Sequence, residues 1–345
     1  IFEIKMNKRI AIIGSGMSGI TLAKKLSASN EVVVFDKSRG IGGRMATRRV
    51  EEYNFDHGAQ FFTAKSEEFK EFCNQAKKDG VIEEWQCRFA EIVDDKIHRN
   101  WQFGTDKAHF VGKPQMNSFC KYIGQGLEIL LGKQIESIYF DNQKWSLKTA
   151  ENEIFDNFDY LFLAIPSHQA VNLIPKNFKY FDVVANVKMM GCFSLMLGFK
   201  ENLKMDFDAA LVKKSIISWI SANSSKPGRP EGFSLLINSS NGWADENIEE
   251  DVDLVKEKMI DALQKIINFR PNQIEYQNVH RWRYANASLR EGQKSLFDAN
   301  MNLGICGDWL ISGRVENAFL SAVDLCKNIN NERKGFGILP STIKE

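Results

Sequence analysis

A glycine-rich turn near the start of the chain carries the clearest chemical pattern in the sequence. The short apolar segment 9–13 leads directly into Gly14, Gly16 and Gly19 of a Gly-x-Gly-x-x-Gly turn. Glycines at these positions permit a tight turn and a close approach of the backbone to a ligand. The N-terminus of a following helix offers N–H groups and a positive dipole end to a pyrophosphate. The pattern predicts a strand, a turn and a helix that bind a dinucleotide.

An acidic residue ends the second predicted strand. The valine-rich segment 31–35 is followed by Asp36, which stands 22 positions after Gly14. A carboxylate at this point can accept hydrogen bonds from the two hydroxyl groups of a ribose. Strand, glycine turn, helix, strand and acid together form the first half of a doubly wound nucleotide-binding fold, which favours dinucleotide binding over an ordinary glycine turn.

The segment after this acid indicates which dinucleotide is bound. Residues 36–44 contain Asp36, the basic Lys37 and a Gly42-Gly43-Arg44 sequence. Paired glycines let the backbone lie against a ligand, and Arg44 can neutralise a pyrophosphate. The segment resembles the flavin signature of amine-oxidase-like flavoproteins, which implies FAD rather than NAD. The alternative is a solvated basic loop.

Composition bounds the remaining possibilities. The chain has 345 residues, with 45 Lys and Arg, 44 Asp and Glu, and a net charge of +1. This length suits two domains, and this balance gives no general attraction to nucleic acid or anionic membranes. No apolar run approaches the ~18 residues of a membrane helix. The six cysteines form no Cys-x-x-Cys pair, which argues against a zinc site and favours a reducing cytoplasm.

Alternating apolar and polar segments predict an α/β protein with two interleaved domains. We expect strands over 133–140, 144–150, 153–156, 160–165, 192–199, 216–220, 233–237, 274–284 and 303–306, helices over 252–267 and 315–326, and a loop over 223–230. The doubly wound FAD-binding (Rossmann-type) domain would comprise residues 6–64, 113–170 and 290–330. A substrate domain on a mixed or antiparallel sheet would comprise 65–112 and 171–289, and 331–345 would form a C-terminal tail.

Several longer segments resemble bacterial renalases. They are Phe35 to Gly40, Arg44 to Arg49, Phe55 to Phe62, Val111 to Asn117, His280 to Ala285, Cys306 to Asp308 and Arg314 to Phe319. Together they extend from about residue 8 to about residue 328. One departure is the Lys113-Pro114-Gln115 sequence, where the resemblance leads us to expect an apolar residue and a glycine in place of Lys113 and Gln115.

The resemblance implies a set of residues that hold FAD without a covalent bond. The pyrophosphate would be contacted by Gly14, Ser15, Gly16, Ser18 and Gly19. Asp36 would contact the adenosine ribose. The segment from Lys37 to Arg44, which includes Gly43, would lie along the phosphates. Ala59, Gln60 and Phe61 would lie against the isoalloxazine, and Ile135 would reach the adenine side through its backbone. Asp308 would face the ribityl chain or a phosphate. Val315 and Glu316 would begin a helix whose N-terminus points at flavin N1 and the C2 oxygen.

An aromatic strand is the candidate substrate surface. With a period of two, His280, Trp282 and Tyr284 share one face of segment 274–284, and Arg281 and Arg283 share the other. The aromatic face could clamp a flat heteroaromatic ring, with an arginine such as Arg283 holding a phosphate. The alternative is a sheet face packed on the core, with surface arginines.

The sequence contains no obvious acid–base pair, nucleophile elbow or metal-ligand spacing. Hydride transfer from a dihydropyridine to flavin N5 needs positioning rather than a base. The renalase resemblance implies oxidation of the 2- or 6-dihydro isomers of NAD(P)H to NAD(P)⁺, with O2 as acceptor and H2O2 as product. The alternatives are a flavin amine oxidase acting on small amines and a non-catalytic FAD-binding module.

Overall fold

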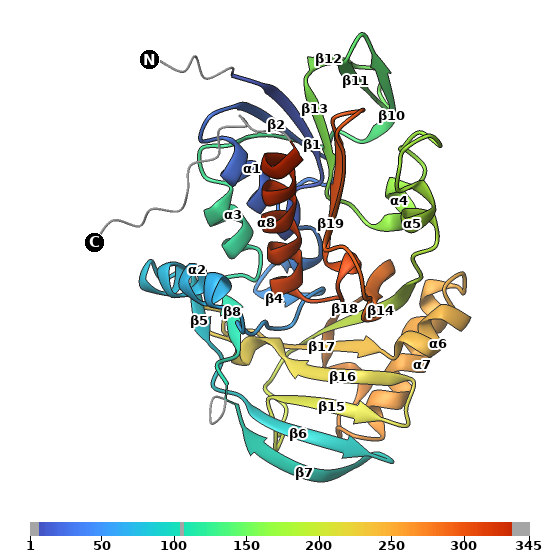
Figure 1. Ribbon diagram of the computed structural model, residues 1–345. Coiled ribbons are helices and arrows are strands. Elements are labelled where there is room, and N and C mark those ends of the chain that lie inside the picture. Colours follow the sequence, from blue (N-terminus) through green and yellow to red (C-terminus); the bar gives the residue numbers. More distant parts are fainter. Residues whose placement is uncertain (1–6, 104–106, 333–345) are drawn as a thin grey trace. The chain divides into compact units, whose positions relative to one another are not determined.

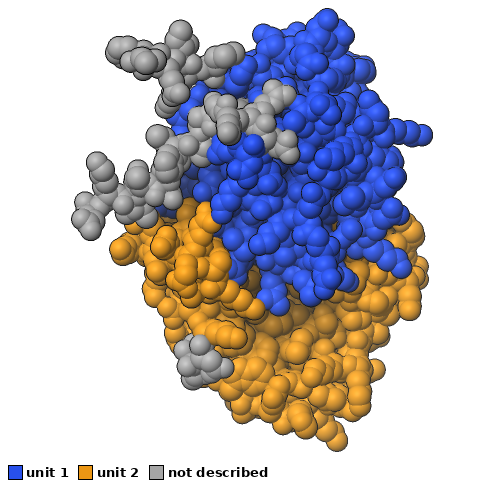
Figure 2. All heavy atoms as spheres, viewed as in Figure 1, with its two compact units in different colours: residues 1–43, 120–188, 287–345 blue, residues 44–119, 189–286 orange. Residues whose placement is uncertain are grey.

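The computed structural model describes residues 7–103 and 107–332. The chain divides into two compact units, coloured separately in Figure 2. Unit 1 comprises residues 1–43, 120–188 and 287–345, and unit 2 comprises residues 44–119 and 189–286. Most of the predicted C-terminal tail, residues 333–345, lies outside the described residues.

Unit 1 is built on a six-stranded sheet (Figure 1). All neighbouring strands are parallel except β19 and β20, which pair antiparallel. The apolar residues of β1 and β2 are almost wholly buried, as in parallel sheets covered on both faces. The strands in sheet order are β19 (Ser295–Asp298), β20 (Leu303–Cys306), β13 (Tyr160–Leu163), β1 (Arg9–Ile13), β2 (Glu31–Asp36) and β9 (Glu128–Leu131).

Helices and a small antiparallel sheet complete unit 1. The sheet consists of β10 (Ile135–Asp141), β11 (Lys144–Thr149) and β12 (Ile154–Phe158). The helices are α1 (Met17–Leu26), α4 (Ser167–Ala170), α5 (Phe181–Ala185), the 3-10 helix η4 (Asp308–Leu310) and α8 (Val315–Glu332), and α3 (Ser118–Ile123) begins at the end of unit 2. Apolar side chains of α1 and α8 join the core around β1, β13 and β20, and the two helices lie side by side in Figure 1.

Unit 2 is built on a seven-stranded mixed sheet. Its order is β18 (Ile274–Ala287), β14 (Met189–Phe199), β17 (Phe233–Ser239), β16 (Ile217–Ala222), β15 (Ala209–Lys213), β6 (Arg88–Val93) and β7 (Lys96–Gln102). The β6–β15 pair is parallel. Two short antiparallel pairs accompany the sheet, β3 (Thr47–Val50) with β4 (Tyr53–Asp56) and β5 (Ile82–Glu84) with β8 (Phe110–Gly112). The helices are α2 (Glu67–Lys78), α6 (Asn241–Glu246), α7 (Val252–Gln264) and the 3-10 helices η1 (Gly43–Met45), η2 (Asn223–Ser225) and η3 (Pro271–Gln273).

The predicted fold class is confirmed: a doubly wound, Rossmann-type unit accompanies a second unit on a mixed sheet. The unit boundaries differ from the predicted ones. Residues 44–64 and 113–119, expected in the FAD-binding domain, lie in unit 2, and 171–188 and 287–289 lie in unit 1. The reason for residues 44–64 is packing, because Tyr53 and Phe55 of β4 share a core with Met196 and Leu236 of the seven-stranded sheet.

The described residues contain neither a candidate membrane helix nor a candidate metal-binding cluster. Within residues 7–103 and 107–332, no helix combines the length and the apolar character that a membrane crossing requires. The same residues contain no group of three or more His, Cys, Asp or Glu side chains arranged to hold a metal ion.

Candidate functional site

The glycine turn of unit 1 has the geometry of a phosphate-binding loop. Gly14 has a positive φ of 107° and donates its N–H to the carbonyl of Phe35 at 2.7 Å. A Cβ at Gly19 would lie 1.8 Å from the carbonyl oxygen of Gly14, so only glycine permits this contact between turn and helix. A Cβ at Gly16, the N-cap of α1, would have no neighbour within 4 Å among the described residues. The backbone at Gly16 is therefore open to a ligand.

The structure brings the two predicted glycine segments together. Gly16 and Gly42 form an isolated parallel β-bridge, and the Gly42 N–H donates to the carbonyl of Ser15 at 3.1 Å. Gly43 has a φ of 53°, and a Cβ there would lie 3.2 Å from the Cα of Gly16. Lys37 is exposed. The sequence signals for a pyrophosphate loop and for a flavin-specific segment thus meet beside the N-terminus of α1.

Asp36 holds the glycine turn from the end of β2. Its carboxylate is buried and accepts hydrogen bonds from the backbone N–H and the hydroxyl of Ser15, both at 2.6 Å, and from the N–H of Ser38 at 2.8 Å. A carboxylate has about four lone-pair sites, so it can bind a ribose hydroxyl while it fixes the turn. The buried hydroxyl of Ser18 donates to the carbonyl of Ala318 in α8 at 2.9 Å.

The C-terminal part of unit 1 supplies two buried acids and a helix N-terminus. Asp308 begins η4 and is separated from the end of β20 by Gly307, and Glu316 lies in the first turn of the 18-residue helix α8. Val315 is half-buried at the start of α8. Ile135 is buried at the start of β10, opposite Thr149 of β11. Asp308, Val315, Glu316 and Ile135, which are all predicted to contact FAD, thus belong to unit 1.

Unit 2 carries the remaining residues predicted to bind FAD. Arg44 is half-buried, and its Nη1 donates to the carbonyl of Ala285 at 3.1 Å. The carbonyl of Arg44 accepts from the Ala59 N–H at 2.8 Å, and a Cβ at Gly58 would lie 2.0 Å from this oxygen. The segment that contains Ala59, Gln60 and Phe61 is therefore held tightly against the backbone of Arg44.

Three flat side chains meet at β18. The imidazole rings of His57 and His280 are stacked, with centroids 4.8 Å apart and planes 10° apart. The ring of Trp282 packs edge-on to His280 at 4.3 Å, and its Nε1 donates to the carbonyl of His57 at 2.7 Å. His57 is more than nine-tenths buried, and its Nδ1 has no hydrogen-bond partner among the described residues. Within the described residues, the group of three rings therefore contains a buried polar atom without a partner, which is rare in folded proteins.

Burial sets the protonation state of these imidazoles. It lowers the pKa of His57 to about 3, with further lowering by the charges of His280 and Arg48 that outweighs the opposite effect of Asp56. Burial and the charge of Arg48 lower the pKa of His280 to about 4. Both rings are therefore neutral at neutral pH.

The other predicted substrate residues are Tyr284 and the two arginines of β18. Tyr284 is half-buried on β18. Arg283 makes a bidentate ion pair with Glu249, with 2.9 Å between Nη2 and Oε2, and Arg281 donates to the carbonyl of Glu250. The two arginines thus bind the segment before α7 rather than the aromatic group. Arg48 of β3 donates to the side chain of Asn278 at 2.9 Å.

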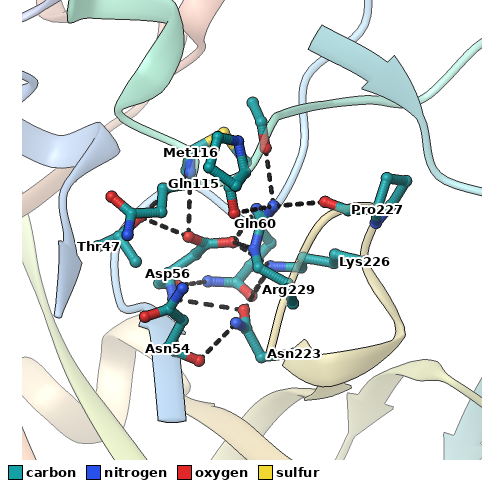
Figure 3. Close-up of polar contacts among 12 residues, drawn as sticks. Thr47, Asn54, Asp56, Gln60, Gln115, Met116, Asn223, Lys226, Pro227 and Arg229 are labelled. Atoms are coloured by element: carbon teal, nitrogen blue, oxygen red, sulfur yellow. Dashed lines mark hydrogen bonds and ion pairs between the residues drawn. The ribbon is translucent and has the colours of Figure 1, made fainter. Parts of the chain in front are cut away.

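A buried charge cluster beside Gln60 was missed by sequence reasoning (Figure 3). The carboxylate of Asp56 accepts from Arg229 Nη2 at 2.6 Å and from Lys226 Nζ at 3.2 Å. All three side chains are completely buried. Burial alone would raise the pKa of Asp56, but the charges of Lys226 and Arg229 and a hydrogen bond from Thr47 lower it to about 2. We define the Asp56 cluster as Asp56, Lys226 and Arg229.

The cluster is connected to Gln60, a predicted FAD residue. Gln60 Oε1 accepts from Lys226 Nζ at 3.3 Å and from the Ser221 hydroxyl at 3.0 Å. Its Nε2 donates to the carbonyls of Asp56 and Gly58 at 2.6 and 2.9 Å. The amide is thus bound by protein groups at both ends, so Gln60 can meet a ligand through its backbone while its side chain holds the segment.

Comparisons with known proteins agree with this architecture. A model described as an NAD(P)-binding Rossmann-like domain matches residues 12–76, and one described as flavin containing amine oxidoreductase matches residues 91–330. A crystal structure described as a protoporphyrinogen oxidase from Exiguobacterium sp. 255-15 is similar with a TM-score of 0.73 at 12% identity, over 94% of this chain and 99% of that chain. The crystal structure of an oxidoreductase from Methanosarcina mazei is similar with a TM-score of 0.68 at 12% identity, over 92% of this chain and 100% of that chain.

The solved structures are too distant in sequence to show more than the fold. The second family model, in contrast, covers more than half of the chain, and the first covers the glycine turn and Asp36. Together with the open backbone at Gly16 and the buried Asp36, these matches show that the chain belongs to the flavin-containing amine oxidoreductase family and is an FAD-dependent oxidoreductase.

Proposed function

We propose that this oxidoreductase oxidises the 2- or 6-dihydro isomers of NAD(P)H to NAD(P)⁺ and uses O2 as electron acceptor. The observation that carries the proposal is the neutral aromatic group of His57, His280 and Trp282 in unit 2. Flat uncharged rings offer a surface on which a flat nicotinamide ring can stack. The resemblance of the sequence to bacterial renalases supports the same substrate class.

The protonation state of the group suits this chemistry. Because burial keeps both imidazoles neutral above about pH 4, the rings carry no charge that would repel a pyridinium product. A dihydropyridine that loses a hydride becomes aromatic, so no base has to remove a proton from the reacting carbon. Bound FAD supplies the two-electron acceptor for the hydride and the means of passing electrons to O2, with formation of H2O2. The protein's part is to orient the ring.

Arg48 is the candidate phosphate partner. It lies close enough to His57 and His280 for its charge to lower the pKa of both rings, whereas Arg283 is paired with Glu249. We therefore propose Arg48, in place of Arg283, as the group that attracts the anionic part of a dinucleotide. A guanidinium is well suited to phosphate because it donates several hydrogen bonds in one plane.

The same proposal assigns the FAD contacts within each unit. In unit 1, Gly14, Ser15, Gly16 and Gly19 would face the pyrophosphate, and Asp36 the ribose. Lys37, Gly43, Ile135, Asp308, Val315 and Glu316 complete the unit 1 set. In unit 2, Arg44 would approach the phosphates, and Ala59, Gln60 and Phe61 the isoalloxazine. The tight fixation of residues 58–60 by Arg44 and Gln60 supports a preorganised ring site. We also propose a cytoplasmic location, where the six buried thiols stay reduced.

Oxidation of small amines is the second candidate, and the family match favours it. The positive charges of unit 2 argue against an amine substrate. An amine substrate enters as a cation or must lose a proton, whereas Arg48 and the Asp56 cluster, with two cations and one carboxylate, add positive charge to unit 2.

Product analysis in air tests the proposal. Purified holoprotein is mixed with each dihydronicotinamide isomer, with ordinary 4-dihydro NADH or with a small amine, and O2 uptake, H2O2 and NAD(P)⁺ are measured. We expect one H2O2 and one NAD(P)⁺ per O2 with the 2- or 6-dihydro isomers. Turnover with amines and none with the isomers would transfer the assignment to amine oxidation.

A further inference from the structure

The Asp56 cluster contains one carboxylate and two cations, all with completely buried side chains. Arg229 has other partners, since its Nη1 donates to the carbonyls of Gly112, Pro114 and Pro227, each at 2.8 Å. These carbonyls are neutral, so they do not remove the excess of one positive charge. A buried charge without a counter-charge is unfavourable, so an anion that binds near the cluster would be stabilised by it.

The groups around Lys226 provide a single carboxylate as counter-charge, and Lys226 shares it with Arg229. Its Nζ contacts Asp56 of β4 at 3.2 Å, Gln60 at 3.3 Å and Asn223 of η2 at 2.9 Å, and lies 5.3 Å from the ring of Trp85. The charged and titratable groups that face it are Asp56, Arg229 and Cys87, and burial raises the pKa of the Cys87 thiol, which stays neutral. Asp56 is therefore the carboxylate that opposes two cations.

Burial lowers the pKa of Lys226 to about 8; the charge of Asp56 acts in the opposite direction, and the charge of Arg229 lowers the pKa further. This lysine can thus exchange its proton near neutral pH, unlike a surface lysine with an ordinary pKa of ~10.4. A negative charge that appeared nearby would restore the electrical balance and hold the proton on Nζ.

The cluster touches the segment at which we place the flavin ring. Lys226 bonds directly to the side chain of Gln60, whose backbone lies between Ala59 and Phe61. Two further bonds from Gln60 fix the carbonyls of Asp56 and Gly58 in the same segment. A charge on a ring against residues 59–61 would therefore act on Lys226 through a buried and poorly screened region.

We propose that Lys226 is the buried counter-charge of reduced FAD, and that it takes up a proton when FAD is reduced in alkaline solution. The inference rests on the part of the proposed function that places Ala59, Gln60 and Phe61 against the isoalloxazine, and it is independent of the substrate. Addition of two electrons and one proton to neutral oxidised FAD yields an anion. Where Lys226 is neutral beforehand, a second proton from solvent is taken up by its Nζ.

A potentiometric titration of the wild-type holoprotein tests the proton uptake. The FAD midpoint potential is measured from pH 6.5 to 9.5 with xanthine and xanthine oxidase as reductant and a reference dye. One proton per two electrons changes the potential by about 30 mV per pH unit, and two protons by about 59 mV per pH unit. We expect the smaller slope below about pH 8 and a steeper slope above it. A slope of about 30 mV per pH unit throughout would overturn the proposal.

Two matched variants test the residue. Lys226→Met removes the charge at similar volume, and Lys213→Met removes the charge of a half-exposed lysine paired with Glu91 in the same unit. We expect Lys226→Met to lose the steep region and to disfavour reduction at pH 7 at least tenfold, which is about 30 mV for a two-electron couple. The Lys213→Met variant should behave as wild type. Equal potentials in Lys226→Met and wild type would refute the role of Lys226.

The two experiments separate this inference from the substrate assignment. If Lys226→Met does not retain FAD, the slope of the wild-type titration decides alone. Because the reductant is not a dihydronicotinamide, a protein that ignores those substrates can still show the break near pH 8. That result would leave the role of Lys226 standing while the substrate proposal failed.

Discussion

Asp56 is the only carboxylate that contacts two buried cations among the described residues, and the stability of unit 2 depends on it. Asp56→Asn would leave Lys226 and Arg229 close together and without their counter-charge. Loss of one partner of a buried ion pair typically costs about 3–5 kcal/mol. We expect a loss of this size in the free energy of unfolding, measured by urea denaturation at pH 7. The control is Asp261→Asn at an exposed position of α7, and equal stabilities of the two variants would contradict the account.

The roles of the residues in the Asp56 cluster could not be predicted from the sequence, and the reason is physical. Segment 223–230 was predicted as a loop, and loops usually lie at the surface, where lysine and arginine are solvated. In the structure, Lys226 and Arg229 are instead directed at Asp56, which is about 170 positions away in the chain. The place of Asp36 at the end of β2, beside the glycine turn, was predictable from local spacing, whereas the contacts of Asp56 form only in the folded chain.

At the scale of elements, two glycines of the β1–α1 turn have different functions: Gly19 permits close packing, and Gly16 leaves space for a ligand. A Cβ at Gly19 would collide with the carbonyl of Gly14, whereas one at Gly16 would enter open space. We expect Gly16→Ala to fold like wild type and to bind FAD at least tenfold more weakly, because the added methyl group occupies the approach of the pyrophosphate. Gly19→Ala should destabilise the fold itself. Circular dichroism and FAD titration of the apoprotein measure both effects, and unchanged FAD affinity in Gly16→Ala would place the pyrophosphate elsewhere.

The imidazole pair at β18 makes stability depend on pH. Burial holds the pKa values of His57 and His280 at about 3 and 4, below the ordinary value of ~6.5. Between about pH 4 and 6.5 the unfolded chain therefore binds protons that the folded rings reject, and stability falls as the pH falls through this range. Each such ring contributes up to about 1.36 kcal/mol per pH unit.

Variants of the pair check this dependence. His57→Phe should reduce the slope of the unfolding free energy against pH by about one proton between pH 4.5 and 6. His98→Phe, at an exposed position of β7, should leave the slope unchanged. The measurement is urea unfolding at each pH, and a His57→Phe slope equal to that of wild type would show that His57 is protonated in the folded protein.

Elements with a strong local pattern were predictable, and the hairpin of β6 and β7 was not. The predicted strand at 9–13 matches β1, and the predicted helix at 315–326 matches the first two-thirds of α8. Strands β6 and β7 were not predicted, and for β7 the reason is that every residue is exposed and the segment shows no alternation of apolar and polar residues. Its pairing with β6 is satisfied by backbone hydrogen bonds and leaves little trace in side-chain types.

At the scale of the whole molecule, the interleaving of the two units was only partly predictable. Segment 44–64 follows the glycine turn directly, so it was placed with the nucleotide-binding strands. Its hairpin, β3–β4, instead packs its aromatic side chains on the sheet of unit 2. Sequence order alone cannot distinguish these outcomes, because apolar residues of β4 would fit either core.

We expect the protein to bind FAD without a covalent bond. The candidate contacts are hydrogen bonds and charges from Gly16, Asp36 and Arg44, and all six cysteines are buried in the structure. We expect a yellow protein that releases its flavin into the supernatant on acid precipitation. Absorbance at the flavin bands in the supernatant and the pellet measures this, and flavin retained in a washed pellet would indicate a covalent bond.

The most direct measurement of the proposed activity is anaerobic flavin bleaching in a stopped-flow instrument. The holoprotein is mixed in turn with 2-dihydro-NAD(P), 6-dihydro-NAD(P), 4-dihydro NADH and a small amine. Stacking on His57, His280 and Trp282 fixes one ring position, and a displacement of the hydride carbon by ~1 Å can cost ~100-fold in rate. We predict fast bleaching by the 2- or 6-dihydro isomer and bleaching at least 100-fold slower by 4-dihydro NADH and by amines. Faster bleaching by the amine than by either isomer would contradict the account.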